Sequence, residues 1–248
     1  MPILTLTSDI GSKDFLAGAL KGQVLQVNES FHLVDISHQL TPFNYPQAAY
    51  ICRNAFRQFP PESFHMVLVN MFDSKPDHLL LAHHNGQYIG IADNGLLTMI
   101  LEEEPKEVVA IALDKATQKT ALYLCRMLAQ AFTDLLSGRR LDQIGDASVS
   151  IQVKNHLRPM LGNNWIEGQI IFIDHFENVV VNITREDFEA QRKGRSFKIV
   201  FKRDEVIDKV SESYADVQEG EKLALFNSAG YLEIAINKGN AAGLFGLQ

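Results

Sequence analysis

The stretch Ile3-Leu4-Thr5-Leu6-Thr7, followed at once by Ser8-Asp9-Ile10-Gly11, decides the fold class. The first segment is short, apolar and partly β-branched, which is typical of a buried strand. The second segment is a polar turn, and the chain then places apolar residues at helical spacing, at Leu16, Leu20, Val24 and Val27. Asp14 stands where the N-cap of that helix is expected. A buried strand that leads directly into an amphipathic helix predicts the first unit of an α/β domain.

The same alternation continues to about residue 137. Further strands are expected at 31–37, 66–70 and 107–113, and further helices at 45–59 and 121–137, the last closed by Gly138. This order predicts a mostly parallel sheet covered by helices. Asn85-Gly86 lies between two apolar runs, 79–84 and 87–92, and predicts a hairpin because both turn positions need a positive φ.

The pattern changes after about residue 155. Strands without long intervening helices are expected at 168–173, 179–183, 196–201, 222–227 and 231–237. Thr184-Arg185-Glu186-Asp187 resembles a capping box that opens one short helix. The polar stretch 155–164 joins the two regions. The sequence therefore predicts an N-terminal α/β domain at 1–155 and a smaller, antiparallel β domain at 165–248.

Composition excludes several classes of protein. The 248 residues are 46% hydrophobic and 21% charged, as in ordinary globular proteins, and the net charge of −7 argues against a nucleic-acid binder. No apolar stretch reaches the about 20 residues of a membrane span, and the first residues do not resemble a signal peptide. Cys52 and Cys125 are too few and too far apart for a disulfide framework. We expect buried, reduced thiols in a cytoplasmic protein that binds no membrane.

The histidines do not predict a metal site. His83 and His84 are neighbours in a predicted strand, so their side chains point to opposite faces. His38 and His78 have no second ligand at helical spacing. The sequence also lacks a P-loop and a GxSxG elbow.

Polar residues stand at the carboxyl ends of three predicted strands, where parallel sheets bind their ligands. They are Asp9, Asp35 and Asn70. A carboxylate on a tight strand-to-helix turn, such as Asp9, can accept two hydrogen bonds from a vicinal diol such as a ribose. The alternative is that Asp9 only caps the helix that follows.

The second region has two polar turns that could bind a ligand. Asp174, Phe176 and Asn178 lie between two strands, and an aromatic ring flanked by polar side chains suits a planar heterocycle. The alternative is an ordinary turn with one buried ring. Asn227-Ser228-Ala229-Gly230 could form a backbone nest with a hydroxyl for a carboxylate, or be a plain turn.

These motifs, in their order and spacing, resemble the S-adenosyl-L-methionine (SAM) hydroxide adenosyltransferase family, which includes the SAM-dependent fluorinase and chlorinase. The resemblance spans nearly the whole chain. It is carried by 7–11 with Asp14, Gly18 and 21–22, by 34–38, by Pro42-Phe43 with 47–49, by 92–97, by 173–178 with 182–183, and by 227–235.

The resemblance implies that a nucleophile attacks C5′ of the ribose of SAM and expels methionine; water gives adenosine. It implies no cofactor beyond SAM itself, and a homotrimer with sites at subunit interfaces. By matched position it assigns Asp9 to the ribose hydroxyls, Phe43 to the ribose side, Asp14 and Asp174 to the methionine ammonium, Ser228 to the carboxylate, and Asn178 and Tyr214, beside Phe176, to adenine.

The water-activating part of the family pattern is replaced. The hydrolases of the family use an Asp-Arg-His triad, and the matching positions here hold Asn70, Asp77 and Tyr123. Glu177 replaces the glycine of the Phe-Gly-Asn turn. We therefore expect either a divergent SAM hydrolase that places water with these residues, or a homotrimer that binds SAM or adenosine without turnover. The sequence shows no halide pocket that would favour halogenation.

Overall fold

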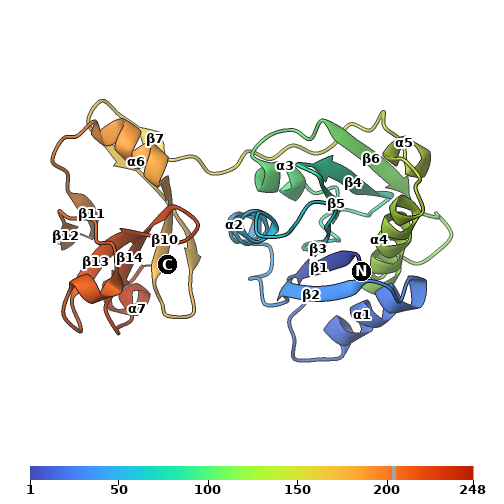
Figure 1. Ribbon diagram of the computed structural model, residues 1–248, viewed down its shortest axis with the longest axis horizontal. Helices are drawn as coiled ribbons and strands as arrows, with labels where there is room; N and C mark the ends of the chain where they lie inside the picture. Colours follow the sequence, from blue (N-terminus) through green and yellow to red (C-terminus); the bar gives the residue numbers. More distant parts are fainter. Residues whose placement is uncertain (203–204, 248) are drawn as a thin grey trace. The chain divides into compact units, whose positions relative to one another are not determined.

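The computed structural model describes residues 1–202 and 205–247, and the chain divides into two compact units, Met1–His156 and Leu157–Gln248 (Figure 1). The N-terminal unit is built on a six-stranded sheet with the order β2-β1-β3-β5-β4-β6. Its strands are β1 (Ile3–Ser8), β2 (His32–Ser37), β3 (Phe64–Leu68), β4 (His78–His84), β5 (Gln87–Ala92) and β6 (Glu107–Ala112). All neighbouring pairs are parallel except the two that β4 forms, with β5 and β6. The mostly parallel sheet predicted from the sequence is thus confirmed.

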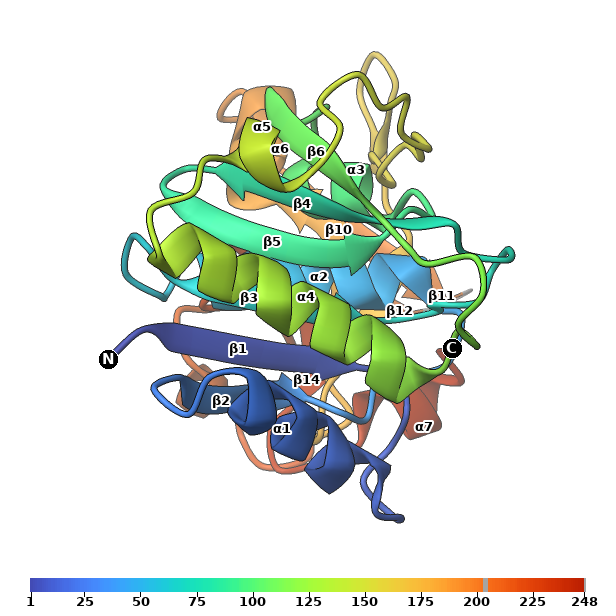
Figure 2. The same ribbon diagram turned by 90° about the vertical axis from the view of Figure 1, so that its right-hand side faces the viewer.

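Helices cover both faces of this sheet. They are α1 (Leu16–Val27), α2 (Tyr45–Phe56), α3 (Leu96–Leu101), α4 (Ala121–Leu136) and the short α5 (Leu141–Ile144). α1 and α4 pack on one face, whereas α2 and α3 pack on the other (Figure 2). Successive strand residues alternate between the two cores: Met66 and Leu68 face α4, and Val67 faces α2. Burial of both faces explains why these strands are continuous apolar runs in the sequence.

Two turns confirm the expected backbone chemistry. Asn85 and Gly86 have φ values of 50° and 76°, and they join β4 to β5 as a hairpin. Gly138 follows Ser137, the C-cap of α4, and has a φ of 91°, which is the left-handed conformation that ends helices. In β5, a Cβ atom on Gly90 would lie 2.8 Å from the ring of Phe132. The absent side chain lets α4 pack closely on the sheet.

Several predicted boundaries were wrong: the helix expected at 45–59 ends at Phe56, and the strand expected at 196–201 begins at Ile199. Two further differences concern candidate site residues. Phe15, not Asp14, holds the N-cap position of α1, and Asp14 accepts a hydrogen bond from the backbone N–H of Leu16 at 2.8 Å. β3 ends at Leu68, so Asn70 does not end the strand. Asn70 has a φ of 43°, and this left-handed backbone turns the chain out of the sheet.

The C-terminal unit is antiparallel, as predicted. Its main sheet has the order β13-β14-β10-β9, and two strand pairs, β7–β8 and β11–β12, accompany it. The strands are β7 (Met160–Leu161), β8 (Ile166–Glu167), β9 (Ile170–Ile173), β10 (Val179–Thr184), β11 (Ile199–Lys202), β12 (Glu205–Ile207), β13 (Lys222–Phe226) and β14 (Tyr231–Ile236); the helices are α6 (Arg185–Arg192), α7 (Ala241–Phe245) and the 3₁₀ turn η1 (Tyr214–Asp216). Thr184 and Asp187 form the capping box of α6.

Both cysteines are buried and free, as expected, and burial raises the pKa of the Cys52 and Cys125 thiols to about 12. Such thiols stay protonated and unreactive near neutral pH. Within residues 1–202 and 205–247, no helix has the length and apolar character needed to cross a membrane.

Candidate functional site

The polar candidate residues of the N-terminal unit lie at the edge of the sheet where the parallel strands end. In the register of β1 and β3, Ser8 lies opposite Leu68, so the turns that follow these strands start side by side. In the antiparallel hairpin, Leu79 lies opposite Ala92. The beginning of β4 therefore meets the end of β5 at the same edge.

Asp9 and Asn70 are brought together at this edge. The backbone N–H of Asn70 donates to Oδ2 of Asp9 at 3.0 Å. This bond ties Asp9 to the neighbouring turn. The alternative, that Asp9 only caps α1, is therefore wrong. Oδ1 of Asp9 has no hydrogen-bond partner in the part of the chain that the structure describes, and it can accept from a ligand.

The side chain of Asn70 is held from two sides. Its Nδ2 donates to the hydroxyl of Tyr45 at 2.6 Å and to Oδ1 of Asp73 at 3.0 Å. A carboxylate only accepts hydrogen bonds, so the NH₂ end of the amide must face Asp73. The buried Asn94 donates to the backbone oxygens of Val69 and Asn70 at 3.0 and 3.1 Å. Both amide hydrogens of Asn70 are used, and its Oδ1 remains as a fixed acceptor.

A chain of hydrogen bonds supports the turn that carries Asp9. Ser8 Oγ lies 2.7 Å from Nδ1 of His38, whose Nε2 lies 3.2 Å from Asp35. Lys21 completes the chain with Nζ 2.5 Å from Asp35. Although burial raises the pKa of the Asp35 carboxyl, the hydrogen bonds from Lys21 and His38 outweigh it and lower that pKa.

This Ser-His-Asp chain does not form a nucleophile site. Ser8 is 0% exposed, so its hydroxyl cannot reach a substrate. The backbone oxygen of His38 also accepts from the N–H of Gly11 at 2.6 Å. His38 therefore holds both ends of the segment from Ser8 to Gly11, with Asp9 between them.

Asp77 does not contact Asn70. Its Oδ1 lies 2.5 Å from Nδ1 of His78, and Nε2 of the same ring lies 3.2 Å from Asp93. Asp93 is nearly buried and also accepts from the backbone N–H of Gln152 at 2.8 Å. His78 is thus bridged between an exposed and a buried carboxylate, an arrangement that the sequence spacing did not reveal.

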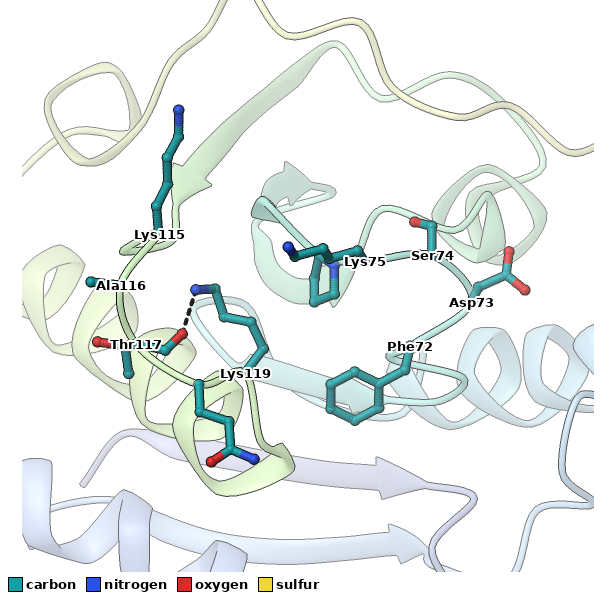
Figure 3. Close-up of a pocket in the computed structure, with 10 residues that line it drawn as sticks. Phe72, Asp73, Ser74, Lys75, Lys115, Ala116, Thr117 and Lys119 are labelled. Carbon is teal, nitrogen blue, oxygen red and sulfur yellow. Dashed lines mark hydrogen bonds between the residues drawn. The ribbon is translucent and has the colours of Figure 1, made fainter.

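Tyr123 lies on α4, and its hydroxyl accepts from the backbone N–H of Asp114 at 3.1 Å. The loop 115–119 that follows Asp114 faces the loop 72–76 across a pocket of about 660 Å³. Figure 3 shows Lys75 and Lys119 on opposite walls of this pocket, with Phe72 and Asp73 beside them. The loop that leaves Asn70 is therefore adjacent to the loop that leads to Tyr123.

Phe43 and Asp14 are exposed in the N-terminal unit. Phe43 stands in the turn before α2 with a φ of 64°, and its ring is free of the core. Asp14 accepts from its own turn, at the backbone N–H of Leu16. Neither has a contact with Asp9 or Asn70 in the described residues.

In the C-terminal unit, Asp174 organises the turn between β9 and β10. Its Oδ1 accepts from the N–H groups of Phe176 and Asn178 at 2.8 Å each, and its Oδ2 accepts from Nδ2 of Asn178 at 3.1 Å. Glu177 has a φ of 63°, in the conformation that favours glycine. The ring of Phe176 is 73% exposed, so it is not the buried ring of an ordinary turn.

Tyr214 contacts a buried acid that the sequence analysis did not single out. Its hydroxyl donates to Oε1 of Glu233 at 2.6 Å, and Glu233 is 3% exposed. Burial raises the pKa of both groups, and the nearby Asp174 carboxylate raises both further. The signal was a glutamate within an otherwise apolar strand, Leu232-Glu233-Ile234.

Ser228 is exposed at the tip of the turn between β13 and β14. Asn227 closes this turn, since its Oδ1 accepts from the N–H groups of Ala229 and Tyr231 at 3.0 and 3.2 Å. Within residues 1–202 and 205–247, no group of three or more His, Cys, Asp or Glu side chains could hold a metal ion.

Comparison with known proteins identifies the family. The family model for the SAM hydroxide adenosyltransferase N-terminal domain matches residues 4–145, and the model for the C-terminal domain matches residues 168–248. The chain belongs to the SAM hydroxide adenosyltransferase family. The resemblance drawn from the sequence motifs is thereby confirmed.

Relatives of this SAM hydroxide adenosyltransferase family member cover its whole length. It is 25% identical to the (R)-S-adenosyl-L-methionine hydrolase of Methanocaldococcus jannaschii, over 100% of this chain and 93% of the relative. It is 26% identical to a fluorinase of Nocardia brasiliensis, over 100% of this chain and 94% of the relative. A crystal structure of an uncharacterized conserved protein from Thermotoga maritima superimposes with a TM-score of 0.85 and 27% identity, covering 99% of this chain and 96% of that one.

Proposed function

We propose that this protein binds SAM and hydrolyses it to adenosine and L-methionine, with water or hydroxide attacking the ribose C5′. The observation that most supports the proposal is the contact between Asp9 and Asn70, because it joins the residue that we assign to the ribose to the residue that we assign to water. Family membership and the names of the relatives support the same reaction.

The ribose is assigned to Asp9. Its Oδ1 is open, and its Oδ2 is oriented by the backbone of Asn70. A carboxylate accepts hydrogen bonds from both hydroxyls of a vicinal diol, which fixes the direction of C5′. Phe43, exposed in the turn before α2, supplies an apolar surface on the ribose side.

The methionine and adenine ends of SAM are assigned mainly to the C-terminal unit. Asp174 uses three of its about four acceptor positions on its own turn and keeps one for the ammonium. Asp14 adds a second carboxylate, and Ser228 donates to the methionine carboxylate. Carboxylates lower the energy of a ligand that carries a sulfonium and an ammonium.

Adenine is assigned to Phe176, Asn178 and Tyr214. The Nδ2 of Asn178 is engaged by Asp174, so its Oδ1 remains to accept from an amino group. The exposed rings of Phe176 and Tyr214 offer faces for stacking.

The reaction needs a placed water more than an acid. The water oxygen forms a bond to C5′, the C5′–S bond breaks, and its electron pair neutralises the sulfonium as methionine leaves. Asn70 Oδ1 accepts from the attacking water and directs its lone pair, while the released proton passes to solvent. Asp77 and Tyr123, the other two replaced positions, stand at the same edge of the sheet, and this mechanism needs no proton transfer to either of them.

The binding residues are divided between two units, and neither unit contains the full set. As the family resemblance implies, we propose a homotrimer in which the N-terminal unit of one subunit and the C-terminal unit of a neighbour enclose SAM. Enclosure removes water from the nucleophile and strengthens the electrostatic contacts.

Incubation of the purified protein with SAM, with adenosine and methionine followed by chromatography, tests the proposal. We expect the two products in equal amounts, above the rate of SAM breakdown in buffer. Binding of SAM by calorimetry without adenosine would reject the enzyme and leave a binding protein. Asp9→Ala should lose activity, because it removes the proposed ribose acceptor and the partner of the Asn70 backbone N–H. Lys106→Met, which changes an exposed lysine elsewhere, is the matched control.

A further inference from the structure

Four side chains of the N-terminal unit, one of them Asn70 itself, form a closed ring of contacts. Asn70 Nδ2 contacts the Tyr45 hydroxyl at 2.6 Å and Asp73 Oδ1 at 3.0 Å. Lys154 closes the ring, since its Nζ lies 3.9 Å from the centroid of the Tyr45 ring and 4.0 Å from Asp73 Oδ2. The lysine is therefore in contact with both groups that hold Asn70.

The root of Lys154 is fixed by the fold. Its backbone N–H donates to the hydroxyl of Thr98 at 3.0 Å, and that hydroxyl donates to the backbone oxygen of Lys154 at 2.9 Å. Thr98 is buried in α3. The segment that carries Lys154 is thus attached to a helix of the core.

The stem of Lys154 has a place made for it. A Cβ atom on Gly95 would lie 2.5 Å from Cγ of Lys154, so any other residue at this position would force the lysine stem to shift. Gly95 has a φ of 85°, so glycine is favoured there twice, by its backbone and by the lysine stem. Because the stem packs against Gly95, at the start of α3, its ammonium can reach the ring of Tyr45.

We propose that Lys154 is a positioning residue that holds Asn70 Oδ1 in the direction needed to place water. Its ammonium attracts the Asp73 carboxylate and the face of the Tyr45 ring, so both acceptors of the Asn70 amide depend on one charge. Without it, Asp73 and Tyr45 move independently and the amide can rotate. The role in placing water rests on the proposed hydrolysis, whereas the ring of contacts is observed independently of it.

Three variants test the charge of Lys154. Lys154→Met keeps the length of the stem and removes the charge, Lys154→Arg keeps the charge, and Lys106→Met removes an exposed lysine elsewhere. We expect Lys154→Met to lower kcat about 10-fold or more with KM for SAM unchanged, because misplacement of a reacting group costs rate rather than binding. Lys154→Arg should stay within about 3-fold of wild type, and Lys106→Met should be unchanged.

A double-mutant cycle separates positioning from general damage. If Lys154 acts through Asp73, Lys154→Met combined with Asp73→Asn lowers kcat no further than Asp73→Asn alone. Additive losses, or a kcat of Lys154→Met within about 2-fold of wild type, would overturn the inference.

Nuclear magnetic resonance of the Asn70 side-chain amide reports on the ring without turnover. We expect the chemical shifts of the two Asn70 amide protons to change in Lys154→Met and to stay at their wild-type values in Lys106→Met. If wild type makes no adenosine yet these shifts respond, the proposed hydrolysis fails and the ring stands. If they do not respond, the ring is rejected whatever the activity.

Discussion

The backbone N–H of Asn70 donates to the carboxylate of Asp9 across 3.0 Å, although the two residues are 61 positions apart in the chain. The bond joins the turns that follow two neighbouring parallel strands. It ties the group that we propose for the ribose to the group that we propose for water.

Replacing Asp9 by alanine should abolish nucleoside binding. In the proposed site, the substitution removes the carboxylate that accepts from both ribose hydroxyls, and hydrogen bonds to a charged group are worth about 1.5–3 kcal/mol each, or about 10- to 100-fold in affinity. Calorimetry with adenosine measures this loss. Affinity equal to that of wild type would refute the ribose assignment.

Replacing Asn70 by alanine should lower kcat at least about 10-fold, with a smaller effect on KM, because the lost acceptor meets water and not SAM. Tyr45→Phe is the matched comparison, since it removes one of the two groups that hold the amide and leaves the acceptor in place. It should lose less activity than Asn70→Ala. Equal losses in steady-state kinetics would show that the Oδ1 atom has no direct part.

Glu233→Gln should weaken the dependence of stability on pH. The pKa of Glu233 is raised in the folded protein by burial, so the folded state favours the protonated form. Its contribution is fully present below the unfolded pKa of about 4.3 and is lost as pH rises through the folded pKa. The neutral amide suffers no such loss, so the variant should be more stable than wild type near neutral pH. Chemical denaturation at several pH values measures the difference, and parallel curves would contradict it.

The same variant should lower the pKa of Tyr214. Burial, the hydrogen bond to Glu233 and the charge of that carboxylate all raise it, and Glu233→Gln removes the charge. Ultraviolet absorbance of tyrosinate, titrated upward in pH, follows the change. Tyr214→Phe identifies the signal, because it removes that titration altogether.

Replacing Ser8 by alanine should destabilise the N-terminal unit by about 1–3 kcal/mol, because Nδ1 of the buried His38 loses its partner. His38 also holds Gly11, so the turn that carries Asp9 should loosen, and the affinity for adenosine should fall together with the stability. Ser137→Ala, at an exposed serine that is not part of this series of hydrogen bonds, controls for the loss of a hydroxyl. Unchanged stability and affinity would show that the hydrogen-bond chain does not support Asp9.

Light scattering tests the homotrimer. The predicted result is a particle of about three subunits, and a clean monomer would remove the model of a site shared between subunits.

Periodicity predicted most of the fold. Short apolar runs alternate with segments that have helical spacing, and this alternation predicted the parallel sheet. Asn85-Gly86 predicted the hairpin between β4 and β5. Both signals are local in the sequence. The short α3 was missed because six residues give too little periodicity to distinguish a helix from a buried strand.

The site was harder to predict for a physical reason. Motifs pointed to Asp9 and Asn70, but a hydrogen bond between two turns 61 positions apart decides what they contact. Nothing near Asp73 or Tyr45 in the sequence indicates Lys154. A buried glutamate such as Glu233 is visible only as a charge in an apolar strand, and its partner Tyr214 lies 19 positions away.

The path of residues 149–154 has a practical consequence for anyone who divides the protein. The family model ends at residue 145, but Val149 and Ile151 pack against the core, and Lys154 reaches the ring around Asn70. An N-terminal fragment cut at 145 would keep every strand of the six-stranded sheet and lose the segment that braces its polar edge. A fragment that extends to His156 would keep both.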